Sequence, residues 1–333
     1  MAPPTRVPRR PLSDEDAAVQ LIAEVLARAL GTPPPGDVWI GDDAAVVSVP
    51  GGRFVFATDA VVAGVHADLS LTGLDDLGWK ALTATVSDVG AVGGRPSHAV
   101  VDFCVAPGTD LELLAKGTAE AAAEWRCPIV GGDLTAAPEI VVVAAVVGLL
   151  EGDGPPVLRS GASPGDALFV TGPLGASAAG LRLLRAGAGD PASAVTAHKR
   201  PRARIEEGVV ARRAGATAMM DVSDGLALDL GRLAEASAVG VRLDTLPVAE
   251  GATEEEVLAG GEDFELVIAT PAPARLADAF SSAGLRLPIE IGRCTGDRTE
   301  RTLRGGPLGS GGFRHHLGWR RGEPASERRA RPG

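Results

Sequence analysis

Short acidic motifs recur along this chain, and they restrict its fold because clustered carboxylates need water or a cation beside them. The six motifs are Gly41-Asp42-Asp43, Thr58-Asp59, Ser87-Asp88, Gly131-Gly132-Asp133, Asp221-Val222-Ser223-Asp224 and Gly260-Gly261-Glu262-Asp263. Two carboxylates about 5 Å apart repel each other by roughly 3 kcal/mol at an effective dielectric constant of about 20, which raises their pKa values. If the motifs converge in space, divalent cations would relieve this repulsion. The pattern therefore predicts a site for metal ions.

Lysine is scarce near the acidic motifs, where a phosphate ligand would have to bind. Lysine occurs only at positions 80, 116 and 199, with almost none near the acidic motifs, and no G-x-x-x-x-G-K-[ST] run is present. A P-loop is therefore excluded. The formal net charge of -11 also argues against a nucleic-acid partner, because phosphate backbones are bound by clustered Lys and Arg. We expect any nucleotide to be held through metal ions.

The composition is that of a globular protein with more than one core. A chain of 333 residues with 45% hydrophobic residues favours two domains. Cys104, Cys127 and Cys294 are odd in number and lie mostly in apolar runs, so we expect reduced thiols and a cytoplasmic location. The first 13 residues lack the apolar stretch of a secretory signal, and the longest apolar run, residues 140–150, is too short to cross a bilayer, so we expect no membrane association.

Local patterns predict an α/β fold in two halves. Pro50-Gly51-Gly52 is typical of a hairpin turn between strands 44–49 and 54–58, and Asp75 is the expected N-cap of a helix over residues 76–92. Residues 152–165, rich in Gly, Pro and Ser, are the expected linker. We predict an N-terminal domain over 14–151, a C-terminal α/β domain over 152–319 and flexible ends over 1–13 and 320–333. The expected elements are strands 99–105, 127–130, 140–150, 167–171, 217–220, 241–243, 264–270 and 287–291, and helices 110–125, 176–185, 201–214, 225–236, 254–259 and 274–283.

Each motif also has a plain structural interpretation. Ser223 or Asp224 would serve as an ordinary helix N-cap, although free N–H groups at a helix start also bind phosphate. His66 and Phe313 would be packing residues, and Arg159 a surface residue or a bidentate phosphate clamp. The repetition of Gly or Ser beside Asp at successive strand ends favours ligand binding.

Taken in order, these segments resemble the thiamine-monophosphate kinase family, whose superfamily includes aminoimidazole ribonucleotide synthetase and selenophosphate synthetase. The resemblance covers residues 41–313. It rests on the acidic motifs, the first of which is followed by Ala44, and on His66, seven residues after Asp59. Gly225 directly follows the Asp221–Asp224 motif, and Phe264-Glu265-Leu266 directly follows the Gly260–Asp263 motif. The other matching segments are Arg159-Ser160-Gly161 and Pro164-Gly165-Asp166. The family often has Ser where this chain has Ala57.

The resemblance implies a two-domain aminoimidazole ribonucleotide synthetase-like α/β fold, with an N-terminal mixed sheet that pairs with a second copy in a homodimer. It implies Mg²⁺ as cofactor, ATP as co-substrate and thiamine monophosphate as acceptor. Phosphoryl transfer is expected to be direct and in line, with Asp59, Asp88 and Arg159 acting electrostatically and no residue acting as acid or base. The implied Mg²⁺ ligands are Asp43, Thr58, Asp59, Asp88, Asp133, Asp221 and Asp224. The implied ATP contacts are Gly132, Asp133, Arg159 and Ser223, and the implied acceptor contacts are His66, Glu262 and Phe313.

Two other functions remain open at this point. One is a different ATP-dependent enzyme of the same superfamily. Selenophosphate synthetase is disfavoured because the first cysteine here is Cys104, whereas its reactive residue lies near the N-terminus. The other is a catalytically silent nucleotide-binding sensor that uses the same cleft.

Overall fold

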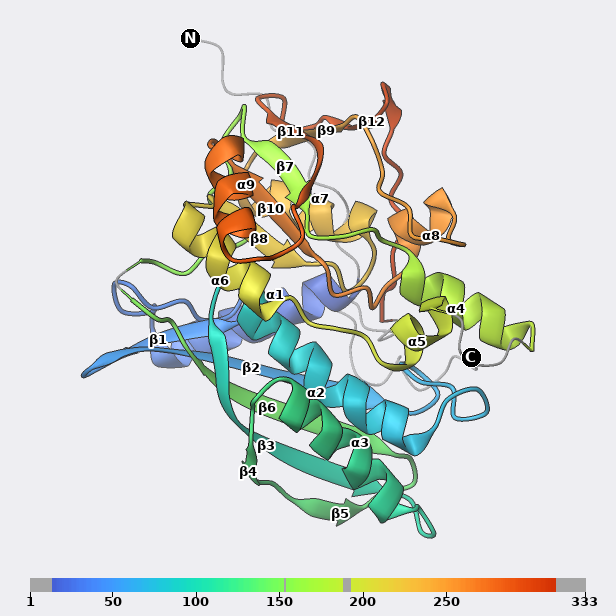
Figure 1. The fold of residues 1–333 in the computed structure, drawn as a ribbon. Coiled ribbons are helices and arrows are strands. Elements are labelled where there is room, and N and C mark those ends of the chain that lie inside the picture. The colour runs from blue at the N-terminus through green and yellow to red at the C-terminus, as the bar shows by residue number, and fades with distance from the viewer. Residues whose placement is uncertain (1–13, 153, 188–192, 316–333) are drawn as a thin grey trace, which may run out of the picture. The chain divides into compact units, whose positions relative to one another are not determined.

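The computed structural model describes residues 14–152, 154–187 and 193–315 (Figure 1). Residues 36–312 form one compact unit, and the described residues outside this range belong to a second unit. The second unit contains helix α1 (Asp14–Leu30), which our sequence analysis missed, and Val19, Ile22 and Val25 on this helix are exposed. The predicted flexible ends, 1–13 and 320–333, lie outside the described residues.

The N-terminal half of the larger unit is a mixed sheet with strand order β1-β2-β6-β3-β4, and β5 also pairs with β3. The predicted hairpin is confirmed, with Gly51 at a φ of 98° between β1 and β2. The helices α2 (Leu74–Ala91) and α3 (Leu111–Glu124) contribute Leu77, Leu82 and Leu114 to the core that these strands line. The strands are β1 (Ala45–Val49), β2 (Gly52–Val62), β3 (Arg95–Val105), β4 (Ile129–Gly131), β5 (Leu134–Ala136) and β6 (Val141–Leu149).

The start of α2 differs from our prediction. Its N-cap is Gly73 and not Asp75. The Asp76 carboxylate reaches back and accepts a hydrogen bond from the Gly73 N–H at 3.0 Å, while Asp75 is bound by Arg200 at 2.6 Å. Asp75, which the local pattern assigned to capping, is therefore used in a long-range ion pair with Arg200 instead.

The C-terminal half is a seven-stranded sheet with order β13-β12-β9-β11-β7-β10-β8, in which the β9–β12 pair alone is parallel among the described pairings. Both of its faces are buried, because Leu168 and Val170 of β7 pack into one hydrophobic cluster and Ala167 and Phe169 into another. The strands are β7 (Ala167–Val170), β8 (Ala218–Asp221), β9 (Gly240–Leu243), β10 (Leu266–Thr270), β11 (Ile289–Thr295), β12 (Arg301–Leu303) and β13 (Gly306–Pro307).

Helices cover both faces of this second sheet. Residues of α6 and α9 line one cluster, and residues of α7 line the other. Helix α5, β5, β12 and β13 were not predicted, and α6 begins four residues later than expected, at Ile205. The helices are α4 (Ala176–Arg185), α5 (Ser193–Lys199), α6 (Ile205–Ala214), α7 (Leu226–Ala236), α8 (Glu254–Ala259) and α9 (Pro273–Ser282).

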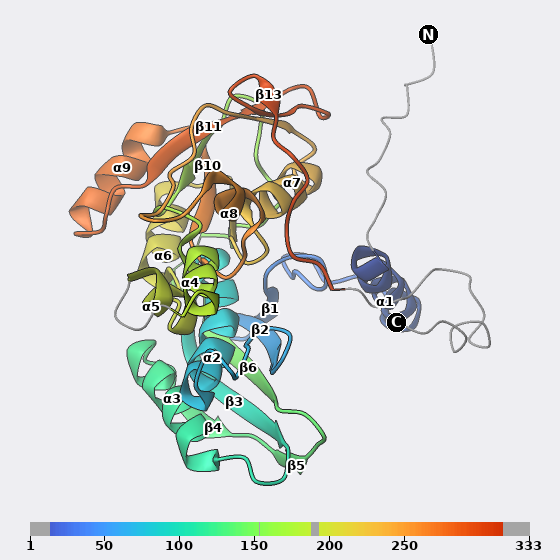
Figure 2. The ribbon, with the colours of Figure 1, turned by 90° about the vertical axis from the view of Figure 1, so that its right-hand side faces the viewer.

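Helix α2 lies between the N-terminal sheet and the C-terminal half (Figure 2). The Trp79 indole N–H donates to the Pro201 carbonyl at 2.9 Å. Near the other end of α2, a Cβ at Gly208 of α6 would lie 2.1 Å from the Gly90 carbonyl oxygen, so the two helices cross in close contact. This contact fixes α2 against the second sheet. The exact limits of the predicted domains, 14–151 and 152–319, stay a prediction.

None of the helices in the described ranges is both long and apolar enough to cross a membrane.

Candidate metal and phosphate site

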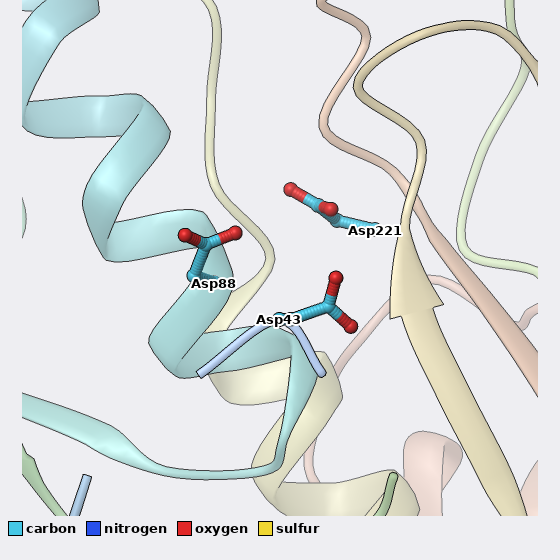
Figure 3. Close-up of side chains that lie close together, drawn as sticks. All are labelled: Asp43, Asp88 and Asp221. Atoms are coloured by element: carbon cyan, nitrogen blue, oxygen red, sulfur yellow. The ribbon is translucent and has the colours of Figure 1, made fainter. Parts of the chain in front are cut away.

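Three of the predicted carboxylates meet at the junction of the two halves (Figure 3). One oxygen each of Asp43, Asp88 and Asp221 lies within 4.8 Å of the others. Asp43 precedes β1, Asp88 is in α2, and Asp221 is the last residue of β8. Side chains distant in sequence therefore point toward one another, as the acidic motifs predicted.

The cluster is buried, which makes its charge costly. The Asp43 side chain is 1% exposed and Asp221 is 2% exposed. Burial raises the pKa of Asp88 well above its usual value, and the nearby Asp59 and Asp221 charges raise it further. Burial also raises the pKa of Asp221, with Asp43 as the next cause. The side-chain Oδ2 of Asp43 is buried with no hydrogen-bond partner. An orphaned carboxylate oxygen beside two others fits a hard cation such as Mg²⁺.

Asp59 adds a fourth carboxylate next to this cluster. It lies on β2 between the buried residues Ala57 and Val61, and therefore faces α2. Burial raises its pKa, and its interaction with the nearby Asp88 side chain acts in the opposite direction. Two carboxylates this close repel each other when both are ionised, so a cation beside them would relieve the repulsion.

Arg159 supplies a positive charge to the cluster. Its guanidinium forms an ion pair with Asp43, with Nε 3.1 Å from Oδ1, and its backbone N–H donates to the Asp42 carboxylate at 3.1 Å. Burial and the Asp43 charge raise the pKa of Asp42 to about 6. Arg159 lies in the predicted linker, so this segment carries its side chain to the acidic residues of the N-terminal half.

The segment after β8 was expected either to cap the next helix through Ser223 or Asp224 or to offer free N–H groups to phosphate, and the structure shows neither arrangement. The N-cap of α7 is Gly225, not Ser223 or Asp224. The backbone N–H groups of Ser223 and Asp224 both donate to the Asp229 carboxylate, at 3.0 and 2.9 Å, so they are not free for phosphate in this structure. The Asp224 side chain pairs with Arg232. Burial, followed by the Asp224 charge, raises the pKa of Asp229 to about 7.

Two residues to which the sequence analysis gave no role in the site connect α2 to the acidic segments. The Ser87 hydroxyl donates to Asp221 at 2.5 Å. The Lys80 ammonium, which is buried, lies 2.7 Å from the Glu262 carboxylate and donates to the His66 carbonyl at 3.0 Å. A lysine therefore does lie beside one acidic motif. Only the spacing of Lys80 and Ser87, seven residues on one helix and thus on one face, carried a signal for this.

His66 and Glu262, the implied acceptor contacts, are brought close to each other through this lysine. The His66 ring also has a structural contact, because its Nδ1 accepts a hydrogen bond from the Val62 N–H at 3.0 Å. Glu262 has a φ of 66°, and its N–H donates to the Ser223 carbonyl at 2.8 Å. The Glu262 loop therefore runs directly beside the segment that follows β8.

Three other predicted site residues, Thr58, Gly132 and Asp133, are not brought to the cluster. Thr58 faces the side of the sheet away from α2, and its hydroxyl donates to the Ala144 carbonyl at 3.0 Å. Gly132 and Asp133 lie beyond β3, where the Asp133 carbonyl accepts from the Phe103 N–H. With about 4.8 Å between strands, Asp133 is roughly 14 Å from β2 across the sheet. Phe313 belongs to the other unit, where its ring meets that of His315 edge-on at 4.9 Å.

Two family descriptions match the two halves. Residues 41–150 match the N-terminal domain of AIR synthase related proteins, and residues 163–303 match the C-terminal domain of the same family.

Curated relatives and a solved structure agree with this match. The chain is 38% identical to thiamine-monophosphate kinase of Bacillus subtilis (strain 168), over 69% of this chain and 76% of the relative. It is also 38% identical to thiamine-monophosphate kinase of Mycobacterium tuberculosis (strain H37Rv), over 79% of this chain and 86% of the relative. A solved structure of AaThiL complexed with AMPPCP and TMP superimposes with a TM-score of 0.76 at 29% identity, over 89% of this chain and 96% of that one.

Proposed function

Since this chain belongs to the thiamine-monophosphate kinase family of AIR synthase related proteins, we propose that it transfers the γ-phosphoryl group of ATP to thiamine monophosphate. The products are thiamine diphosphate and ADP. The observation that carries this proposal is the convergence of Asp43, Asp88 and Asp221 at one buried point. Three acidic side chains from separate parts of the chain, next to an arginine, suit a site where polyphosphate and metal ions meet.

We propose Mg²⁺ as the cation of this site. Asp43, Asp88 and Asp221 would hold it, with Asp59 beside them. Bound Mg²⁺ supplies charge neutralisation to the phosphate oxygens. The roles of Thr58, Asp133 and Asp224 as further ligands remain predictions. For Thr58, the backbone carbonyl is the candidate atom, since its side chain lies on the far face of β2.

The transfer step needs little acid–base help from the protein. An oxygen of the thiamine monophosphate phosphate attacks the γ-phosphorus, the bond from that phosphorus to the β,γ-bridging oxygen breaks, and ADP leaves with that electron pair. The second pKa of a phosphate monoester is about 6, so the nucleophile is largely ionised at neutral pH. The obstacle is repulsion between two anions. We propose that Arg159, which pairs with Asp43, contacts phosphate oxygens that approach the cluster.

A homodimer is part of the proposal. On the sheet face away from α2, Phe56 and Val100 are each 43% exposed and Leu149 is 41% exposed. They lie in three successive cross-strand rows of this face, where Leu149 pairs with Phe54, Phe56 with Val147, and Val100 with Ala145. We propose that two copies pair through this face. Gly132 and Asp133, at the far edge of the same sheet, would then complete a nucleotide site that involves both copies.

We also retain the cytoplasmic location as a proposal. It is supported by Cys104, Cys127 and Cys294, which are free of disulfide bonds.

The proposal is tested by incubating the purified protein with Mg-ATP and thiamine monophosphate and measuring thiamine diphosphate and ADP, with EDTA as a control. We expect Asp88→Asn to lower kcat by at least about a hundredfold without unfolding the protein, because it removes one carboxylate of the cluster. Asp278→Asn on α9 changes an exposed aspartate in the same way and is expected to retain full turnover.

Two outcomes would contradict the proposal. ATP binding by the folded protein without formation of thiamine diphosphate would favour a nucleotide sensor. Near-normal turnover of Asp88→Asn would refute the role of Asp88.

A further inference from the structure

The Lys80 side chain is buried on α2, about two helical turns N-terminal to Asp88 of the metal cluster. It is 2% exposed, and lysine is almost never fully buried unless its charge is paired. Its ammonium has two acceptors, the Glu262 carboxylate at 2.7 Å and the His66 carbonyl at 3.0 Å. These are two of the three residues that the family resemblance places at the acceptor. A buried charge that joins them calls for an explanation beyond packing.

Two basic side chains, Lys80 and His198, lie near the Glu262 carboxylate, and only Lys80 of these two carries a charge. His198 of α5 also approaches, with Nδ1 3.8 Å from the Glu262 Oε2. Burial, followed by the Lys80 charge, lowers the pKa of His198 to about 3, so this ring is neutral at physiological pH. Its Nδ1 instead lies 3.1 Å from the Ser177 hydroxyl. Lys80 is therefore a charged partner of Glu262, whereas His198 is neutral.

The loop that carries Glu262 is in a conformation that needs external support. Glu262 and Phe264 have φ values of 66° and 51°, in the left-handed region that costs non-glycine residues energy. A Cβ at Gly261 would lie 2.4 Å from the Ser223 carbonyl oxygen, so the loop is also pressed against the segment after β8. Such a conformation persists only where the surrounding contacts determine it. The bond from Lys80 is one of these contacts.

Lys80 and Ser87 are separated by seven residues and lie on one face of α2, about 10 Å apart along the helix axis. Ser87 binds Asp221 of the metal cluster, while Lys80 binds the Glu262 loop. One rigid helix therefore holds both parts of the proposed site at a fixed spacing.

We propose that Lys80 is a positioning residue that holds the Glu262 loop and the His66 carbonyl in the conformation that binds the phosphate acceptor. This inference rests on the proposed function. Lys80 acts through Glu262, because its ammonium is paired with that carboxylate. Its loss should weaken acceptor binding and leave ATP binding and the chemical step unchanged.

The test is steady-state kinetics of Lys80→Met, which keeps the buried apolar stem and removes the ammonium. We expect the KM for thiamine monophosphate to rise at least about tenfold, while kcat and the KM for ATP stay within about twofold. Lys116→Met is the matched control, since Lys116 is 63% exposed on α3 and its ammonium lies 3.9 Å from Glu120 on the same helix. We expect this control to keep all kinetic constants.

A double variant separates positioning from a general loss of stability. If Lys80 acts through Glu262, Lys80→Met combined with Glu262→Gln should raise the KM for the acceptor no more than the stronger single change does. Full multiplication of the two effects would overturn the inference, because it would mean that the residues act independently. Should Lys80→Met fail to fold, Lys80→Gln, which keeps an N–H donor, is measured by the same criteria.

Failure of this inference is distinguishable from failure of the proposed function. If the unmodified protein forms no thiamine diphosphate, the proposed function fails. If it is active and the acceptor KM of the Lys80 variant is unchanged or lower, the positioning role alone is wrong.

Discussion

Asp88 lies in a place that disfavours its ionised form in two ways. It is close to the C-terminal end of α2, where the helix dipole favours a cation, and no basic residue occupies the last turn of that helix. Burial and the neighbouring carboxylates act in the same direction on its pKa. A cation in the cluster would compensate all of these effects at once. The unfavourable free energy of the ionised Asp88 side chain therefore indicates a cation as its ligand.

The raised pKa values predict how Mg²⁺ binding depends on pH. Asp88 and Asp221 have pKa values above 3.8 in the folded, metal-free chain. Between the unfolded and folded pKa values, the folded chain binds more protons than the unfolded chain, so its free energy of unfolding falls as pH rises through that range. Mg²⁺ must displace these protons. We therefore expect the rise in Tm on adding Mg²⁺ to be larger at about pH 8 than at about pH 5.

Thermal unfolding monitored by circular dichroism measures this difference. Asp221→Asn should reduce the Mg²⁺-dependent rise, and Asp278→Asn should leave it intact. An equal rise at both pH values would mean that the cluster does not bind the metal.

The sequence motifs were enough to expect Asp43, Asp88 and Asp221 to lie close together, because each stands beside Gly, Ser or another Asp, and their role as metal ligands stays a prediction. The motifs were not enough to find Lys80 or Ser87 as their neighbours. The Lys80–Glu262 contact joins residues 182 positions apart, and Ser87–Asp221 joins residues 134 positions apart. Such pairs depend on how α2 packs between the two sheets, and no local pattern encodes that packing.

At the scale of elements, α2 and α3 pack at unusually short range through glycine. A Cβ at Gly117 of α3 would lie 1.8 Å from the Asp75 carbonyl oxygen, and one at Gly78 of α2 would lie 2.4 Å from the Leu114 carbonyl oxygen. In both cases the obstructing atom belongs to the backbone of the other helix, so no side chain can turn away. Glycine at positions 78 and 117 therefore allows the short distance between these two helices.

Gly117→Ala should consequently separate α2 from α3. We expect a loss of about 1 to 3 kcal/mol in the free energy of unfolding, because overpacking forces the backbone to shift. Urea denaturation measures it. Gly296→Ala is the control, since a Cβ there meets nothing within 4 Å. A Gly117 variant as stable as the control would contradict the close packing.

The ends of helices and strands were predictable where neighbouring residues determine them, and not where contacts with distant parts of the chain determine them. Helices α4 and α8 begin and end at the predicted residues, and α8 has Thr253 as its N-cap with a capping box to Glu256. The short strands β12 and β13 were missed because their few residues have no periodicity of their own and are ordered by pairing with β9 and with each other. Sequence alternation identified the α/β class, and the strand order followed only from the structure.

At the scale of the whole molecule, the apolar face of the N-terminal sheet requires an occupant. We expect the protein to sediment as a dimer and Val100→Arg to sediment as a monomer, because a charge would be buried between the two copies. Val100 is already 43% exposed, so the change should leave the fold intact. Leu287→Arg, at a residue that is 54% exposed before β11, is the control and should stay dimeric. Sedimentation equilibrium distinguishes these states, and a dimeric Val100→Arg would exclude this face as the interface.

The spacing of Lys80, Ser87 and Asp88 on α2 also limits how the chain can vary in length. One residue inserted between Lys80 and Ser87 would turn the rest of the helix by about 100° and advance it by about 1.5 Å. Ser87 and Asp88 would then face away from Asp221 while Lys80 stayed beside Glu262. Loops elsewhere in the chain can lengthen without this effect, so this stretch of helix should accept substitutions more readily than insertions or deletions.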